Sequence, residues 1–343
     1  MTDKISKIFY VWQNHSKFNS LLKIIDIISK NKNSTLLFVN PEEHELFLGC
    51  LRPLDSNESK FSRKKFKRIE EELVKHNVKI EYILGSYSSP FPKDFSIKNF
   101  KVIYWPTFMI HYSDFFIDYD SVLPVKNIDK LFISLNHRSR PDRRYFIDQI
   151  YKNQLENHGY ISWYNAEIED KKSNKFMYFH GNTMTLDNFE FNGILPKEYF
   201  RSLINVISES SVYNLDISEK TWYAVIGKKP FITLAAKNYY KTLKKLGFQL
   251  YYELFNYDFD HYDNYKRRAD SITEQLSQLK NIDLNQTYNT LLPKIEYNYN
   301  HYYNLFYDKS LIPKEYFKYK NRIYKNNQFG YYDTIYERFE TYD

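Results

Sequence analysis

Four arginines crowd into one short stretch, Asn136 to Arg144, at the expected start of a helix. Pro141 suits the first position of that helix, and a helix N-terminus already carries partial positive charge. Cations gathered there repel one another unless an anion binds. A diphosphate would accept hydrogen bonds from the guanidinium groups and from backbone N–H groups. The alternative is a solvated basic turn that Asp142 and Asp148 partly neutralise.

A second group of polar residues follows a β-rich run further along the chain. Ser218 is expected to cap a short helix, with Glu219 and Lys220 in its first turn, and Gly227 is expected to end the helix in the left-handed conformation. Ligands of α/β domains bind near this position, at the carboxyl ends of the strands. The carboxylate of Glu219 can therefore accept hydrogen bonds from both hydroxyls of a ribose, while the ammonium group of Lys220 binds phosphate.

The elements that must position these residues alternate between strand and helix. In the first part of the chain, β-rich runs and helical patterns occur at 6–12, 16–31, 34–39, 62–76, 78–84 and 101–105. The alternation restarts with strands and helices at 130–135, 141–155, 203–208, 219–226, 230–234 and 237–245. This order predicts βαβ units and parallel sheets.

The fold class is therefore α/β, with two Rossmann-like lobes and a mainly helical C-terminal extension. Residues 1–125 are predicted to form the first lobe and 126–310 the second, with a ligand site between them. In a group-transfer reaction the first lobe would face the acceptor substrate, and the second would bind the donor substrate. Helical periodicity continues over about 264–306, and residues 165–196 show no clear period. Residues 311–343 are expected to form a tail that packs on the lobes.

Composition limits the functional classes. Of 343 residues, 43% are hydrophobic and 27% charged, which is typical of a globular chain. No apolar run approaches the roughly 20 residues of a membrane helix. Cys50 is the only cysteine, so a reducing, cytoplasmic setting is expected. The net charge of +7 favours an acidic partner, and a nucleotide sugar would satisfy it.

Two further charged motifs favour structural interpretations. A basic run precedes three consecutive glutamates, Glu70 to Glu72, which can pair with it at helical spacing. The run consists of Lys60, Arg63, Lys64, Lys65, Lys67 and Arg68. An Asp-x-Asp pair, Asp258 and Asp260, could bind a divalent cation. It comes after the second polar group and is expected to cap a turn before the helix that begins near Asn264, so no metal site is predicted.

The second polar group resembles the donor motif of the α1,3-fucosyltransferase family, which has the GT-B fold. That motif reads Glu-Asn-Ser, six residues that include an Asp-Tyr pair, then Val/Ile-Thr-Glu-Lys. Glu209 and Glu219 are ten residues apart, as in the family, and Ile217 to Lys220 match its end. The resemblance implies that Glu219 and Lys220 bind the ribose and phosphates of a nucleotide.

The arginine-rich turn is similar to the same family. There an Arg opens the first helix of the donor lobe and is followed by Phe and Asp, as Arg143, Phe146 and Asp148 stand here. The resemblance implies that Arg143 holds donor phosphate. Where the family has Asn and Tyr, this chain has Ser210 and Asp216, so guanine and fucose do not carry over. The likeness covers about residues 126–260.

The sequence therefore predicts a nucleotide-sugar-dependent glycosyltransferase that is inverting and metal-independent and needs no cofactor. Its acceptor is expected to be a glycan; the alternatives are a DNA-modifying enzyme acting on a hydroxymethylated base, and a non-catalytic protein that binds nucleic acid or glycan. Candidates for the catalytic base are His15, His111 and Asp114. The predicted donor-binding residues are Arg138, Arg140, Arg143, Glu209, Ser210, Asp216, Glu219 and Lys220.

Overall fold

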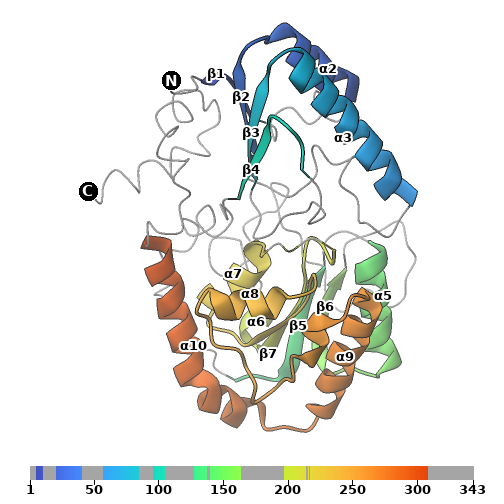
Figure 1. Ribbon diagram of the computed structural model, residues 1–343. Helices are drawn as coiled ribbons and strands as arrows, with labels where there is room; N and C mark the ends of the chain where they lie inside the picture. The colour runs from blue at the N-terminus through green and yellow to red at the C-terminus, as the bar shows by residue number, and fades with distance from the viewer. Residues whose placement is uncertain are drawn as a thin grey trace. The chain divides into compact units, whose positions relative to one another are not determined.

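The computed structural model describes the greater part of the chain (Figure 1). The residues described are 5–10, 21–40, 57–84, 96–104, 127–136, 140–163, 197–213, 215 and 217–307. They fall into two compact units, the first holding the described residues up to 104 and the second those from 127 to 307. The boundary predicted near residue 125 and the predicted tail, 311–343, lie outside the described residues.

The first unit contains a parallel sheet in which chain order and spatial order agree. Its strands are β1 (Ile5–Tyr10), β2 (Thr35–Asn40), β3 (Lys79–Leu84) and β4 (Phe100–Tyr104), paired in the order β1-β2-β3-β4. The helices are α2 (Leu21–Lys30) and α3 (Asn57–Lys75). Because each right-handed crossover moves to the next strand in the same direction, both helices cover one face of the sheet.

The core of the first unit lies between that face and the two helices. Ile28 of α2 and both Ile69 and Leu73 of α3 are fully buried, as are Phe38 and Tyr82 of the strands. The helical residues recur at three and four residue steps, which is the spacing that places side chains on one side of a helix. The sequence pattern thus accounts for the packing of this unit.

The second unit is larger and has a different strand order. Its sheet consists of β5 (Lys130–Asn136), β6 (Gly159–Trp163), β7 (Ser202–Ser208) and β8 (Phe231–Leu234), parallel throughout and ordered β6-β5-β7-β8. The helices are α5 (Pro141–Lys152), α6 (Lys197–Phe200), α7 (Glu219–Ile226), α8 (Tyr239–Lys245), η5 (Asp258–His261), α9 (Tyr265–Gln278) and α10 (Leu284–Tyr307).

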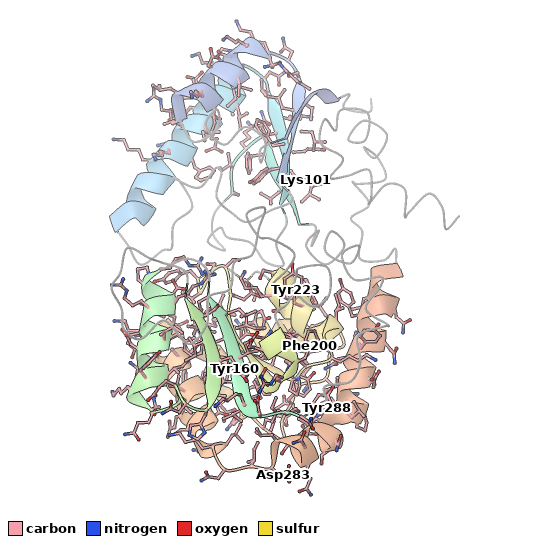
Figure 2. The ribbon with its side chains drawn as sticks, turned by 180° about the vertical axis from the view of Figure 1, so that it is seen from behind. Lys101, Tyr160, Phe200, Tyr223, Asp283 and Tyr288 are labelled. Carbon is pink, nitrogen blue, oxygen red and sulfur yellow. The ribbon has the colours of Figure 1, made fainter. Side chains whose placement is uncertain are left out.

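Helices cover both faces of this second sheet. Helix α5 packs against α9, and α7 packs against α10, with the two pairs on opposite sides of the strands (Figure 1). Side chains fill the interior between these layers (Figure 2). Trp222 of α7 is fully buried, with ring centroids 5.6 Å from Phe248 and 5.4 Å from Tyr302 of α10. These contacts fix α7, which carries Lys220, against the rest of the unit.

The α/β class and the parallel sheets predicted from the sequence are confirmed. One strand was not predicted: β6 lies at the edge of the second sheet and pairs with β5. Helices α9 and α10 fall within the stretch where helical periodicity was expected. Residues 165–196 lie outside the described part. No helix within the described ranges has the length and apolar character needed to cross a bilayer.

The end of α7 differs from the prediction. Gly227 has φ −72°, so it is not left-handed; the left-handed residue is the next one, Lys228, with φ 50°. Position 227 requires glycine because there is no room for a side chain, and not because of its backbone conformation. A Cβ atom there would lie 2.8 Å from the carbonyl oxygen of Tyr223 and 3.0 Å from Cε1 of Tyr199.

The Asp-x-Asp pair lies in the short turn η5, before the helix that begins after Asn264, as the sequence predicted, and Asp260 also serves a second helix. The carboxylate of Asp260 accepts hydrogen bonds from the backbone N–H groups of Tyr240 (3.2 Å) and Lys241 (3.0 Å), so it caps α8. Helix α9 is capped by its own Asn264, which accepts from Lys266 N at 2.8 Å. Burial raises the pKa of Asp260, and these donors oppose that shift.

The glutamates of α3 also find partners other than the basic run before them. Glu72 pairs with Lys75 at 3.2 Å and with His76 at 3.1 Å, both of which follow it. Glu70 accepts from the backbone N–H of Lys98 at 2.6 Å. The pairing expected between the glutamates and the basic run stays a prediction, because part of that run lies outside the described side chains.

Candidate functional site

The strand order of the second unit places a topological switch point at the carboxyl ends of β5 and β7. From β5 the chain crosses through α5 to β6 on one side, and from β7 it crosses through α7 to β8 on the other. The order, 2-1-3-4 by position along the chain, reverses between β5 and β7. Ligands of open α/β sheets bind at such a switch point. Among the described strands of the first unit the order does not reverse, so a ligand site of this kind is expected in the second unit.

Three buried polar atoms at these strand ends have no hydrogen-bond partner among the described residues. They are Oδ1 of Asn136 at the end of β5, Oγ of Ser208 at the end of β7, and Nε of Arg140. The pairing of Ile133 with Asn205, carried three residues onward, sets Asn136 level with Ser208. Because buried polar atoms normally have partners, this edge of the sheet is equipped to meet a polar ligand.

Arg140 joins the turn after β5 to the turn after β7. Its Nη1 donates to the carbonyl oxygen of Ser210, and its Nη2 donates to the carbonyl oxygen of Glu209 at 2.5 Å. Nη2 also lies 3.3 Å from Asp142. The guanidinium group thus spans the switch point and holds two loops together. Backbone carbonyl oxygens and Asp142 take up its two Nη groups, so Arg140 mainly holds the two loops together.

Glu209, which directly follows β7, is fully buried and organises the start of α7. Its Oε1 accepts from Ser218 N at 3.0 Å and from Thr221 Oγ1 at 2.9 Å, and its Oε2 accepts from Ser210 N at 3.0 Å. Charge-assisted hydrogen bonds of this kind are about twice as strong as neutral ones. The carboxylate closes the loop between β7 and α7.

Lys220 projects from the first turn of α7 toward that loop. Its Nζ lies 3.1 Å from Ser210 Oγ and 3.1 Å from Ser218 Oγ. Ser218 also accepts from the backbone N–H of Lys220 at 3.4 Å, which confirms it as the cap of the helix. Two cations therefore meet at one residue, since Lys220 binds the hydroxyl and Arg140 the carbonyl of Ser210.

Arg143 lies in the first turn of α5 and is largely buried, with 6% of its surface exposed. Pro141 opens the helix, as the sequence predicted, and the preceding residue, Arg140, makes no side-chain cap. The first N–H groups of α5 are thus not capped by that side chain, and uncapped groups at a helix N-terminus favour anions. The residue that the family resemblance selected is therefore buried at this end of the helix.

A further arginine, Arg268 of α9, holds the same loop from the other side. It is 2% exposed, and its Nη2 donates to the carbonyl oxygen of Val212 at 2.6 Å. Its Nη1 donates to the carbonyl oxygens of Tyr262 and, at 3.1 Å, Asp263. Burial lowers the pKa of Arg268, and Asp260 opposes that shift. No local motif marks Arg268, because its partners are distant in the sequence.

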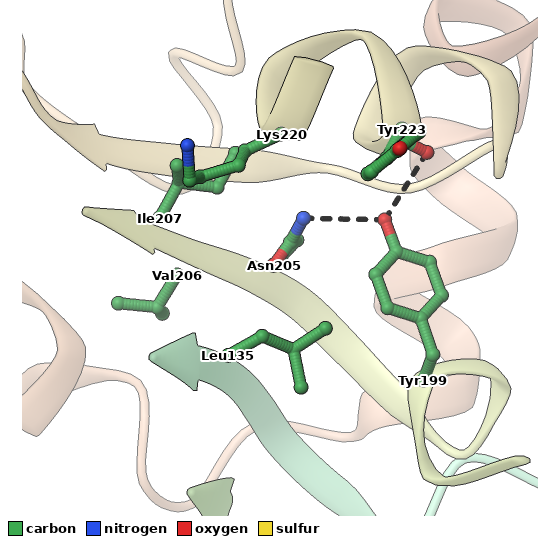
Figure 3. A pocket seen from close by; sticks show the side chains of 7 residues that line it. All are labelled: Leu135, Tyr199, Asn205, Val206, Ile207, Lys220 and Tyr223. Atoms are coloured by element: carbon green, nitrogen blue, oxygen red, sulfur yellow. Dashed lines mark hydrogen bonds between the residues drawn. The ribbon is translucent and has the colours of Figure 1, made fainter. Parts of the chain in front are cut away.

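A small cavity lies beneath α7 on the sheet (Figure 3). Its volume is about 30 Å³, and its lining is mainly apolar. Within it, Asn205 donates to the hydroxyl of Tyr199 at 3.2 Å, which donates to the carbonyl oxygen of Tyr223 at 3.3 Å. Ligand pockets measure about 300–1,000 Å³, so this cavity is a packing space with room for water.

The structure thus brings together four of the predicted donor-binding residues, namely Arg140, Glu209, Ser210 and Lys220, and places Arg143 on the adjoining helix. The backbone of Glu219 begins α7, while its side chain lies outside the described part. The remaining candidates also lie outside it; they are Arg138, Asp216, His15, His111 and Asp114. Within the described ranges, no three His, Cys, Asp or Glu side chains are grouped so as to hold a metal ion.

No family model matches the chain, and no match is found among curated proteins. Two solved structures of glycosyltransferases are similar to it. The DNA-modifying enzyme β-glucosyltransferase, studied with and without its substrate uridine diphosphoglucose, is 12% identical at a TM-score of 0.38, over 87% of this chain and 76% of that one. An α1,3-fucosyltransferase is 11% identical at a TM-score of 0.35, over 88% and 94%. Similarity of this degree assigns the chain to neither family.

Proposed function

We propose that this chain is a glycosyltransferase of the GT-B type that binds a nucleotide-sugar donor at the carboxyl edge of the second sheet. The observation that carries the proposal is the meeting of Arg140 and Lys220 at Ser210, at the switch point between β5 and β7. A pair of cations in that position suits a diphosphate. The resemblance of the segment from Glu209 to Lys220 to a donor motif supports the same ligand.

The roles of the residues follow from their contacts. Lys220 and Arg143 are proposed to bind the diphosphate, the first from α7 and the second from the start of α5. Arg140 and Glu209 act by holding the loops, because the protein around them takes up the two Nη groups of Arg140 and the carboxylate of Glu209. Glu219 is proposed to accept the hydroxyls of the ribose, as the family resemblance implies.

The proposed reaction is a direct displacement with inversion. An acceptor hydroxyl oxygen forms a bond to the anomeric carbon of the sugar while the bond from that carbon to the diphosphate breaks, and a base takes the hydroxyl proton. Negative charge grows on the departing diphosphate, where cations placed in advance are most effective. Lys220 and Arg143 supply that charge, so the mechanism is proposed to be independent of metal. The base is sought among His15, His111 and Asp114.

The donor half of the proposal is tested by thermal stabilisation with a panel of nucleotide sugars. A ligand bound by the folded state alone raises the melting temperature, by an amount that grows with its concentration above Kd. We expect one or more donors to stabilise the wild type, and Lys220→Met and Glu219→Ala to lose that shift. Lys237→Met is the control, because Lys237 pairs with Asp263 on the surface. A panel that stabilises nothing would contradict the proposal.

The acceptor half is tested by transfer. Labelled sugar from the best donor is offered to a glycan array and, separately, to duplex DNA containing hydroxymethylated bases. Label on the glycans supports the proposed acceptor, and label on DNA supports the alternative enzyme class. Donor binding without transfer to either, and without hydrolysis, would indicate a binding protein.

A further inference from the structure

The loop that follows β7 is held rigidly by two arginines from different elements. Three of its carbonyl oxygens, those of Glu209, Ser210 and Val212, accept hydrogen bonds from Arg140 or Arg268. The carbonyl groups of a surface loop usually face water, whereas these three face buried or half-buried guanidinium groups. The backbone that leads into Tyr213 is thereby fixed.

Tyr213, at the end of that fixed segment, is one of the large hydrophobic side chains that stay exposed, with 54% of its surface open. Its backbone N–H donates to Ser211 Oγ at 3.2 Å. Its ring centroid lies 6.0 Å from that of Tyr265, with the ring planes at 79°. The ring is therefore oriented by its neighbour even though it is largely exposed.

Tyr213 is the outer member of a row of three rings contributed by three elements. Tyr265, at the start of α9, lies 6.2 Å from Tyr145 of α5, with the planes at 86°. The hydroxyl of Tyr145 donates to Asp270 Oδ1 at 2.8 Å, and Lys266 Nζ lies 5.2 Å from the centre of its ring. Edge-to-face pairs of this spacing are favourable. We call Tyr213, Tyr265 and Tyr145 the tyrosine row.

We propose that Tyr213 is the surface on which the base of the nucleotide stacks, with the rest of the tyrosine row as its support. This inference rests on the proposed function, since it assigns the base to the donor whose diphosphate lies at Lys220. Ser210, which orients Lys220, precedes Tyr213 by three residues, so their Cα atoms are at most about 11 Å apart. A nucleoside diphosphate spans a comparable distance between its base and its phosphates.

The rigidity of the site favours this use of an exposed ring. A tyrosine already fixed by its neighbours loses little conformational freedom when a planar group stacks on it. Stacking of one base on an aromatic side chain accounts for about 10-fold to 100-fold in affinity by alanine substitution. It also tolerates different bases, because every base has a π face.

The test separates the base from the phosphates. Binding of UDP, GDP, ADP and inorganic pyrophosphate to the full chain is measured by calorimetry for the wild type, Tyr213→Ala and Tyr213→Trp. The control is Tyr297→Ala, which removes an exposed tyrosine from α10. We expect Tyr213→Ala to weaken the binding of at least one nucleoside diphosphate by about 10-fold to 100-fold, while the affinity for pyrophosphate is unchanged. Tyr213→Trp should retain the affinity, and nucleotide should quench the emission of its indole.

The outcomes that overturn the inference are distinct from those that overturn the proposed function. If the wild type binds nucleotides and Tyr213→Ala binds them equally well, the base lies elsewhere and the donor site stands. If Tyr213→Ala weakens pyrophosphate as much as nucleotides, the ring shapes the loop and does not stack on a base. If the wild type binds no nucleoside diphosphate, the proposed function fails, and the inference fails with it.

Discussion

The guanidinium group of Arg140 donates to the carbonyl oxygen of Ser210 and so joins the two loops that border the switch point of the second sheet. The same serine presents its hydroxyl to Lys220. A small displacement of Ser210 would therefore change the position of the ammonium group that we assign to donor phosphate.

Arg140→Lys is expected to weaken this junction while keeping the charge. A lysine ammonium is a point charge and cannot reach two carbonyl oxygens in the forked geometry of a guanidinium group. With hydrogen bonds from a charged group worth about 1.5–3 kcal/mol each, a loss of about 2 kcal/mol of unfolding free energy is expected. Urea denaturation measures it. Arg144→Lys, at an exposed position of α5, is the control; equal midpoints for the two variants would contradict the expectation.

Glu209→Gln is expected to destabilise the second unit by about 2–3 kcal/mol. The amide NH2 of the new glutamine would face an N–H or O–H donor that binds a carboxylate oxygen in the wild type, and two donors cannot form a hydrogen bond. The wild-type carboxylate accepts from Ser210, Ser218 and Thr221. The measurement is the midpoint of chemical unfolding. Glu296→Gln breaks an exposed pair with Lys228 and should cost less than about 1 kcal/mol. A cost for Glu209→Gln as small as that would show that its acceptors are dispensable.

Lys229 is expected to make stability depend on pH. It is buried, and no carboxylate of the described residues contacts it; its Nζ donates to the carbonyl oxygen of Ser202 and lies 5.0 Å from the centre of the Tyr199 ring. Burial lowers the pKa of its ammonium well below the ordinary value. Between that lowered pKa and the unfolded value of about 10.4, the unfolded chain binds more protons, so stability rises with pH.

Lys229→Met removes the titrating group while keeping most of the volume. Unfolding free energies of the two proteins are measured from pH 6 to pH 10, and the wild type should gain stability relative to the variant as the pH rises. Parallel pH profiles would show that the amine titrates as it does in the unfolded chain.

Gly227→Ala is expected to cost about 1–3 kcal/mol, the usual range for inserting a methyl group into a filled space. The new Cβ would press on the carbonyl oxygen of Tyr223 and on the ring of Tyr199. The double variant with Tyr199→Leu should show a cost for Gly227→Ala smaller than the single variant does, since residues in contact are not additive. Strict additivity in thermal unfolding would rule out the contact as the cause.

Local signals in the sequence were sufficient for most elements of the fold. The cap at Ser218 and the proline that opens α5 both depend on residues next to them in the chain. The strand β6 was not predicted, because it is short, begins with Gly159 and carries the polar Ser162. Its strand character comes from pairing with β5, and its glycine is required because a side chain there would overlap the ring of Phe132.

The candidate site was predictable in part for the same reason. Lys220 and Ser210 lie within one motif, and the family resemblance assigned both of them to the same site. Arg140 was predicted to bind phosphate, and the contacts of its guanidinium group with a loop about 70 residues away could not be read from the sequence. Arg268 and Tyr213 were not predicted at all, since their positions depend on how α9 packs beside the loop after β7.

The contact between Arg268 and Val212 joins positions 56 residues apart. The loop after β7 therefore reaches its final shape only when α9 has docked, long after its own strand has been synthesised. If the donor site is as proposed, a chain that ends before α9 would leave the ribosome with its phosphate-binding residues present and its binding ability absent. Donor affinity would then report that the second unit had completed its folding.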